Sequence, residues 1–150
     1  MDEFMDDTLS ANTHIEEMIH LFHQHEASEL FTAVCLAIRA QMNQDGHFLF
    51  PADIAEDESG NPILNFKTLD FGCGPVLVAF TGMAEKEKAP PSDGVSQFIQ
   101  PMLEALLQMS DIEGLLINPF SEPLFLGKED IAMILTPGSE RFIGDSPICL

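Results

Sequence analysis

The sequence predicts an α+β fold: two N-terminal helices, a mixed, roughly five-stranded sheet, a βαβ crossover helix and a C-terminal helix. Three observations predict it. Apolar residues recur at the spacing of one helix face in 15–22 and again in 31–42. Residues 76–80 are apolar without interruption, which is typical of a strand buried on both faces. Residues 114–135 have the pattern of a strand, an Asn-Pro turn, a short strand and a helix.

The two N-terminal helices have recognisable boundaries. Residues Thr13 to Glu16 match a capping box, in which the Thr side chain accepts a hydrogen bond from a backbone N–H and the Glu side chain reaches back. The second helix is expected to start at Ser28, a favourable N-cap, and to run to about Asn43. The Asp45-Gly46 pair ends it.

Five strands are expected, at residues 47–51, 63–69, 75–81, 114–118 and 123–126. A helix over about 98–109 joins the third strand to the fourth, and such a crossover pairs the two in parallel with a right-handed connection. The fifth strand is expected to form a hairpin with the fourth. Glu129 and Asp130 favour the start of the last helix, which ends near Leu135.

The remaining segments are expected to be irregular. Residues 1–11 have the composition of an acidic tail, 53–61 and 83–94 are expected to be loops, and 136–150 an irregular tail. The 150 residues fit one domain. A chain of that length buries about 68–70% of its unfolded surface, so it can form a real core. We therefore predict a single domain over residues 1–150.

The charge of the chain excludes some classes of partner. Six Lys and Arg residues stand against 25 Asp and Glu, which gives a net charge of −19. A nucleic-acid binder neutralises phosphates with Lys and Arg, and anionic membrane surfaces attract the same residues, so neither partner is expected. A basic protein partner suits this charge. A simpler interpretation is that the charge only keeps the protein in solution.

Further features favour the cytoplasm. No apolar run approaches the roughly 20 residues that span a bilayer. The acidic N-terminus has neither the positive start nor the apolar stretch of a secretory signal. Three cysteines, Cys35, Cys73 and Cys149, have no metal or redox spacing, and unpaired thiols suit a reducing compartment.

Three motifs carry a resemblance to a known family. They are a strand ending in Pro (Phe48 to Pro51), a strand ending in Phe-Thr (Pro75 to Thr81), and an apolar-Asn-Pro turn (Gly114 to Pro119). Together with Phe125 and the acidic helix after it, they resemble the SseB-type N-terminal domain of the bacterial "enhanced serine sensitivity" family.

The resemblance extends over about residues 28–135. Glu85 matches a Glu that the family has soon after Phe-Thr, whereas Gly82-Met83-Ala84 lacks the family's small polar residue. The resemblance implies a cytoplasmic module. It carries over no catalytic residue and no cofactor.

Five histidines raise the question of a metal site. Glu16, His20 and His23 share one flank of the first helix, while His14 and His25 lie on another. Zinc requires three or four converging ligands, and three on one exposed helix rarely build a dedicated site. We expect a solvated polar flank and no bound metal.

Cys73 with its flanking glycines and the acidic segment 53–61 are further candidates for chemistry. Cys73 lies between glycines before the third strand, and His47 would be close to it if the first strand pairs there. A nucleophilic cysteine needs a lowered pKa and a base, so a tight turn is the simpler interpretation. The acidic segment 53–61 lacks the spacing of a calcium loop. The segment Gly72 to Pro75 precedes a strand rather than joining a strand to a helix, so it is not a phosphate-binding loop.

The best candidate for a binding site is the turn Asn118, Pro119 and Phe120. Phe120 is expected either to point outward for a partner or to pack under the neighbouring helix. The Asn118 side chain is expected to cap the turn.

Two classes of function remain open. The first is a non-catalytic cytoplasmic protein-interaction module, alone or as a homo-oligomer. The second is a small thiol or metal-dependent hydrolase that uses Cys73 or the histidine flank. The absence of a catalytic constellation favours the first.

Overall fold

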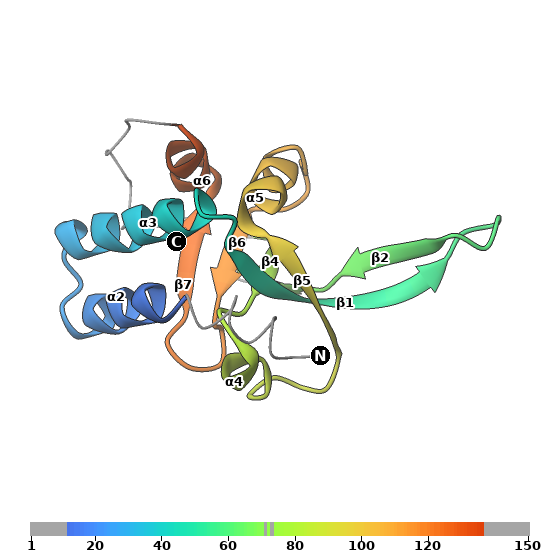
Figure 1. The fold of residues 1–150 in the computed structure, drawn as a ribbon, viewed down its shortest axis with the longest axis horizontal. Coiled ribbons are helices and arrows are strands. Elements are labelled where there is room, and N and C mark those ends of the chain that lie inside the picture. Colours follow the sequence, from blue (N-terminus) through green and yellow to red (C-terminus); the bar gives the residue numbers. More distant parts are fainter. Residues whose placement is uncertain (1–11, 71, 73, 137–150) are drawn as a thin grey trace.

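The computed structural model describes residues 12–70, 72 and 74–136. The fold is α+β, as predicted (Figure 1). The expectations for the tail 1–11, for Cys73, and for the tail after Thr136 lie outside the described residues. The helices of the described chain are α2 (Thr13–Gln24), α3 (Ser28–Met42), α4 (Met83–Lys86), α5 (Ile99–Leu107) and α6 (Lys128–Leu135).

The strands form two sheets, of order β2-β1-β5 and β3-β4-β6-β7. An antiparallel bridge between Leu49 and Phe80 joins the two sheets. The parallel pairing of β4 with β6 through α5 and the antiparallel hairpin of β6 with β7 are confirmed. The strands are β1 (His47–Glu56), β2 (Pro62–Phe66), β3 (Thr68–Asp70), β4 (Pro75–Ala79), β5 (Asp93–Phe98), β6 (Gly114–Ile117) and β7 (Leu124–Gly127).

Three segments differ from the sequence-based expectation. The strand expected at 63–69 is divided at Lys67, because β2 pairs with β1 and β3 pairs with β4. Residues 93–98, expected as loop and helix start, form β5 against β1. The first part of the acidic segment 53–61 is strand rather than loop, since β1 continues to Glu56 and the turn is confined to the residues between β1 and β2. In all three segments, pairing with a distant strand outweighs weak local preferences.

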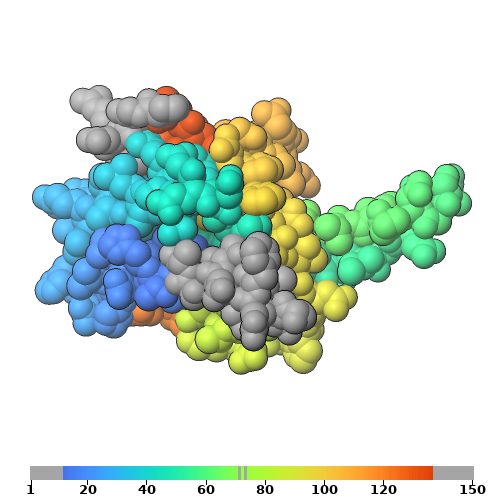
Figure 2. All heavy atoms as spheres, viewed as in Figure 1, coloured from blue at the N-terminus to red at the C-terminus, as the bar shows by residue number. Residues whose placement is uncertain are grey.

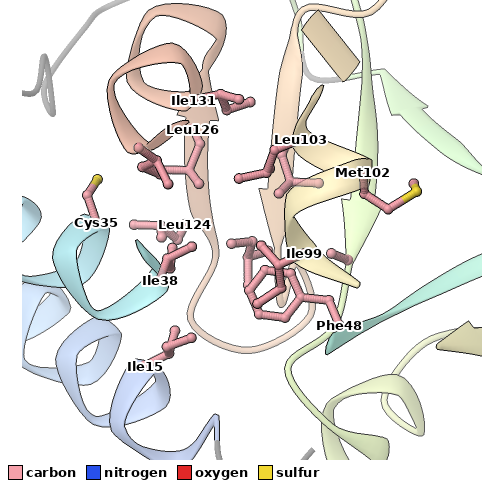
Figure 3. Packing of buried hydrophobic residues seen from close by; sticks show 14 of the residues in the cluster. Ile15, Cys35, Ile38, Phe48, Ile99, Met102, Leu103, Leu124, Leu126 and Ile131 are labelled. Carbon is pink, nitrogen blue, oxygen red and sulfur yellow. The ribbon is translucent and has the colours of Figure 1, made fainter. Parts of the chain in front are cut away.

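The main core lies between the sheets and the helices α2, α3, α5 and α6 (Figure 3). On β4, Leu77 and Ala79 face this core, while Val78 and Phe80 belong to a second apolar cluster with Leu49. Alternation along a strand places those two sets on opposite faces of the sheet. The second face therefore has its own apolar cluster, on the side away from the helices α2, α3, α5 and α6.

A hairpin projects from this body. Every residue from 53 to 65, in the outer part of β1, the turn and β2, is exposed. We call residues 53–65 the arm. It stands clear of the rest of the described chain in both ribbon and space-filling views (Figure 1, Figure 2).

Replacing Gly114 with alanine should destabilise the fold. A Cβ there would lie 2.4 Å from the Leu126 carbonyl oxygen and 2.8 Å from the Phe125 ring. Overpacking of this kind costs about 1–3 kcal/mol. Urea denaturation of Gly114→Ala measures the loss. Gly82→Ala is the matched control, because the nearest atom to its Cβ is 3.9 Å away; equal stability losses in the two variants would contradict the clash.

Candidate functional site

A buried hydrogen-bond network centres on Thr81, at the end of β4. The Thr81 backbone N–H donates to Asn118 Oδ1 at 3.0 Å, and Asn118 Nδ2 donates to the Thr81 hydroxyl at 3.0 Å. The hydroxyl in turn donates to the Glu16 carboxylate. Asn12 Nδ2 donates to the Thr81 carbonyl at 3.0 Å and to the His47 carbonyl at 2.7 Å. We call these five residues the Thr81 network.

The Thr81 network occupies a place where many proteins bind ligands. In open sheets, ligands bind beyond the carboxyl ends of parallel strands, and Thr81 and Asn118 follow the parallel strands β4 and β6. Here the side chains of α2 fill that place, and Asn12, Thr81 and Asn118 are all buried. The network therefore joins the start of α2 to the ends of the parallel strands.

Two helix starts differ from the sequence-based expectation, and the Thr81 network explains the first. The capping box at Thr13 is not formed: α2 has Asn12 as its N-cap, without a side-chain cap bond, and Glu16 is directed to Thr81. Ser28 is not the N-cap of α3 either, because the helix already includes it and the cap is Ala27. At the first helix, tertiary hydrogen bonds have taken the side chains that would otherwise cap it.

Asn118, the first residue of the predicted binding turn, is not exposed. It is buried, with a φ of 52°, a left-handed conformation that Asn tolerates better than most residues. Its backbone N–H donates to the Ala79 carbonyl at 2.9 Å, and its own carbonyl accepts from Ser121. The side chain holds Thr81 rather than capping its own turn.

The histidine flank of α2 makes contacts within the chain. His20 Nδ1 lies 2.9 Å from the Glu122 carboxylate, and His23 Nε2 lies 2.7 Å from the Pro123 carbonyl oxygen. His14 lies near Glu17 on the same helix, and His25 is its C-cap residue. Among the residues that the structure describes, no group of three or more His, Cys, Asp or Glu side chains is placed to hold a metal.

The cysteine hypothesis has little support in the described chain. Cys73 lies outside the described residues. Cys35 is buried on α3, and burial raises the pKa of its thiol, which keeps it protonated and unreactive. The His47 ring lies tilted against the Phe98 ring, with the ring centroids 4.2 Å apart, and its buried Nδ1 has no hydrogen-bond partner among the described residues.

Phe120 borders an apolar groove on the sheet face that the helices leave open. The groove has a volume of about 260 Å³, and Phe120 is 45% exposed at its rim. Pro119 is half-buried beside it. We call this hollow the Phe120 groove; its lining residues come from β1, β3, β4 and the connections, namely Pro51, Lys67, Thr68, Leu69, Val78, Phe80, Ala89, Pro90, Pro91, Ser92 and Phe120.

Polar contacts hold the walls of the Phe120 groove. The Ser121 hydroxyl donates to the Glu85 carboxylate, which fixes the turn after β6 against α4. Lys86 Nζ donates to the Ser92 carbonyl at 2.6 Å and so supports the proline-rich wall. Together these bonds set the spacing between Phe120 and the residues 89–92.

The lining of the groove favours binding over catalysis. Among the residues that the structure describes, no carboxylate, imidazole or thiol lines the groove, and these are the groups that most often act as general acids, general bases and nucleophiles. Its one charged member, Lys67, forms an ion pair with Asp53 at 3.2 Å. The other described lining residues are mostly apolar.

Comparison with known proteins identifies no relative: no family model, no curated protein and no solved structure matches the chain. The resemblance to the SseB-type domain stays a prediction. Among the described helices, none is long and apolar enough to cross a membrane.

Removing the Thr81 hydroxyl should destabilise the protein. Thr81→Val keeps the shape but leaves the Glu16 carboxylate and Asn118 Nδ2 without their partner, a loss of about 1–3 kcal/mol. Chemical denaturation measures the change in unfolding free energy. Thr68→Val, on the exposed strand β3, should change it by less than about 0.5 kcal/mol; a similar loss in both variants would show that the network contributes nothing.

His47 should make stability depend on pH. Desolvation lowers the pKa of His47 from its ordinary value of 6.5, against a smaller opposite effect of Asp45. Below pH 6.5 the unfolded chain therefore binds more protons at this residue than the folded chain, so stability falls as the pH falls. His47→Phe keeps a ring against Phe98 and cannot titrate.

Denaturation curves at pH values from about 7.5 to about 5, on both sides of the ordinary histidine pKa, test this expectation. As the pH falls, the wild type should lose stability relative to His47→Phe. His14→Gln controls for the loss of a histidine. A difference that stays constant across the range would contradict the expectation.

Proposed function

We propose that this protein is a non-catalytic protein-interaction module that binds an apolar side chain of its partner in the Phe120 groove. The observation that carries the proposal is the groove itself: an apolar hollow with an exposed aromatic rim and no acid, base or nucleophile in its lining. Exposed aromatic residues beside pockets are typical anchors of protein interfaces. The sequence adds two expectations to this proposal: that the protein is cytoplasmic, and that its role resembles that of SseB-type domains.

The size of the groove favours a side chain over a cofactor. Its volume of about 260 Å³ is at or below the lower limit of pockets for small molecules, about 300–1,000 Å³. One or two side chains fill such a space. The lining offers few polar groups to orient a metabolite, because only Lys67, Thr68 and Ser92 carry polar side chains there.

The charge of the protein indicates the rest of the partner's surface. A net charge of −19 attracts basic proteins over long distances and repels acidic ones. The partner should therefore combine an apolar anchor with a basic surface around it. Electrostatic attraction of this kind raises association rates more than it raises affinity.

Photo-crosslinking tests the proposal. With a benzophenone amino acid in place of Phe120, a specific partner in a lysate of the source cells should become crosslinked, and excess unlabelled wild-type protein should compete it away. Excess Phe120→Ser should compete poorly, because it lacks the rim of the groove. Phe98, another exposed phenylalanine, is the matched control position.

The outcomes distinguish specific binding at the groove from non-specific crosslinking. A crosslinked protein from position 120 but not from position 98, displaced only by the wild type, supports the groove as the binding site. The absence of any crosslink, identical products from both positions, or equal competition by Phe120→Ser would each overturn it.

A further inference from the structure

The arm is an exposed hairpin with nothing packed against it in the described chain (Figure 2). Two-stranded hairpins without a third strand or a helix beneath them are marginally stable in water. Its apolar residues are also unusual for such a position, since Ile54 is 58% and Leu64 is 39% exposed. A segment of this kind gains order and buried area from a third strand.

One edge of the arm is open for such a strand. β5 pairs with β1 only as far as Ala52, opposite Asp93, and the chain before Asp93 is no longer paired with β1. Leu49 exchanges two backbone hydrogen bonds with Phe80, and the Pro51 carbonyl accepts a hydrogen bond from the Lys67 backbone N–H. The backbone groups of odd-numbered residues in β1 therefore point to the side away from β5. Alternation then directs the backbone N–H and C=O groups of Ile54 and Glu56 to the edge that β5 has left.

The other edge of the arm is protected. β2 begins with Pro62, which has no backbone N–H to donate. Proline on an outer strand is a common means of preventing further pairing. A third strand should therefore add beside β1, in line with β5.

An apolar surface accompanies the open edge. Ile54 and Leu64 are opposite each other in the register of β1 and β2, so their side chains lie on one face. That face continues the core side of β1, because Phe50 and Ile54 alternate along the same strand and Phe50 packs edge-on against Phe66. Added apolar side chains would extend this surface outward from the core.

The charges of the arm point to a basic occupant. Residues 53–65 include Asp53, Glu56, Asp57 and Glu58 and no Lys or Arg. Asp53 pairs with Lys67, and Asp57 Oδ1 accepts from the backbone of the turn at 2.8 and 2.9 Å. Glu56 and Glu58 form no ion pair within the described chain. A second copy of a chain with charge −19 would be repelled, whereas a Lys-rich segment would be attracted.

We propose that the arm binds an extended, basic segment of the partner, which adds as a strand beside β1 at Ile54–Glu56 and packs apolar side chains on the Ile54–Leu64 face. The inference rests on the proposed function and names the class of partner segment. Backbone pairing supplies the affinity of such strand addition, and alternate side chains supply its specificity.

A short peptide that alternates lysine with valine is the probe. In NMR titrations of the full chain, the amides of the arm should shift, and those of Ile54 and Glu56 should become protected from hydrogen exchange. The same peptide with N-methyl groups on alternate residues keeps its charge but cannot pair, so it should bind at least about tenfold more weakly. An alternating glutamate–valine peptide should not bind.

Two surface variants form a matched pair. Leu64→Thr should weaken peptide binding by about tenfold, the effect of losing roughly 1.4 kcal/mol of apolar contact. Ile63→Thr removes an equally exposed side chain from the opposite face of the same strand and should leave affinity within about twofold. Both side chains are about 40% exposed, and threonine suits a strand, so both variants should fold; unchanged denaturation midpoints check this.

The outcomes decide between the explanations. Equal binding of the N-methylated peptide, equal effects of Leu64→Thr and Ile63→Thr, or absence of binding would overturn the arm proposal. So would sedimentation showing a wild-type dimer that Leu64→Thr dissociates. Any of these results combined with a specific crosslink at position 120 would leave the interaction module standing, whereas peptide binding without that crosslink would overturn the groove alone.

Discussion

The architecture depends on one buried threonine, Thr81, whose backbone and side-chain polar groups all form hydrogen bonds. The backbone N–H, carbonyl and hydroxyl of Thr81 all have partners, drawn from α2 and from the turn after β6. Leaving any of these groups unpaired in the core would cost more than the bond itself contributes. The network therefore fixes α2 over the carboxyl ends of the parallel strands, although Asn12 Oδ1 is buried without a hydrogen-bond partner among the described residues.

The helices α2, α3, α5 and α6 lie on one face of the sheet, and the candidate groove lies on the opposite face of β4, around Val78 and Phe80. The connection through α4 partly covers that face and leaves the Phe120 groove between itself and the turn after β6. The face of β4 away from the helices α2, α3, α5 and α6 thus carries an apolar groove.

The sequence predicted the buried elements well and the exposed ones poorly. The run Val76 to Phe80 and the segment from Gly114 onward have apolar patterns that local periodicity detects, and their pairing followed from the crossover rule. β5 and the arm carry no such pattern, because their residues face solvent or are half-buried. Of the groove, only Phe120 was identified, since its other walls come from distant segments that only tertiary pairing brings together.

The division of one extended strand at Lys67 gives the Phe120 groove and the arm a common wall. Pro51 and Lys67 lie at the root of the arm, and both also line the groove, with Thr68 and Leu69 continuing along it. A strand that straightens or stiffens the arm must hold this wall in one place, and a side chain seated in the groove presses on the same residues. Under the two proposals the two contacts share these residues, and any coupling between the contacts changes both affinities by the same factor. A ligand that engages both surfaces would thereby be distinguished from one that reaches only a single surface.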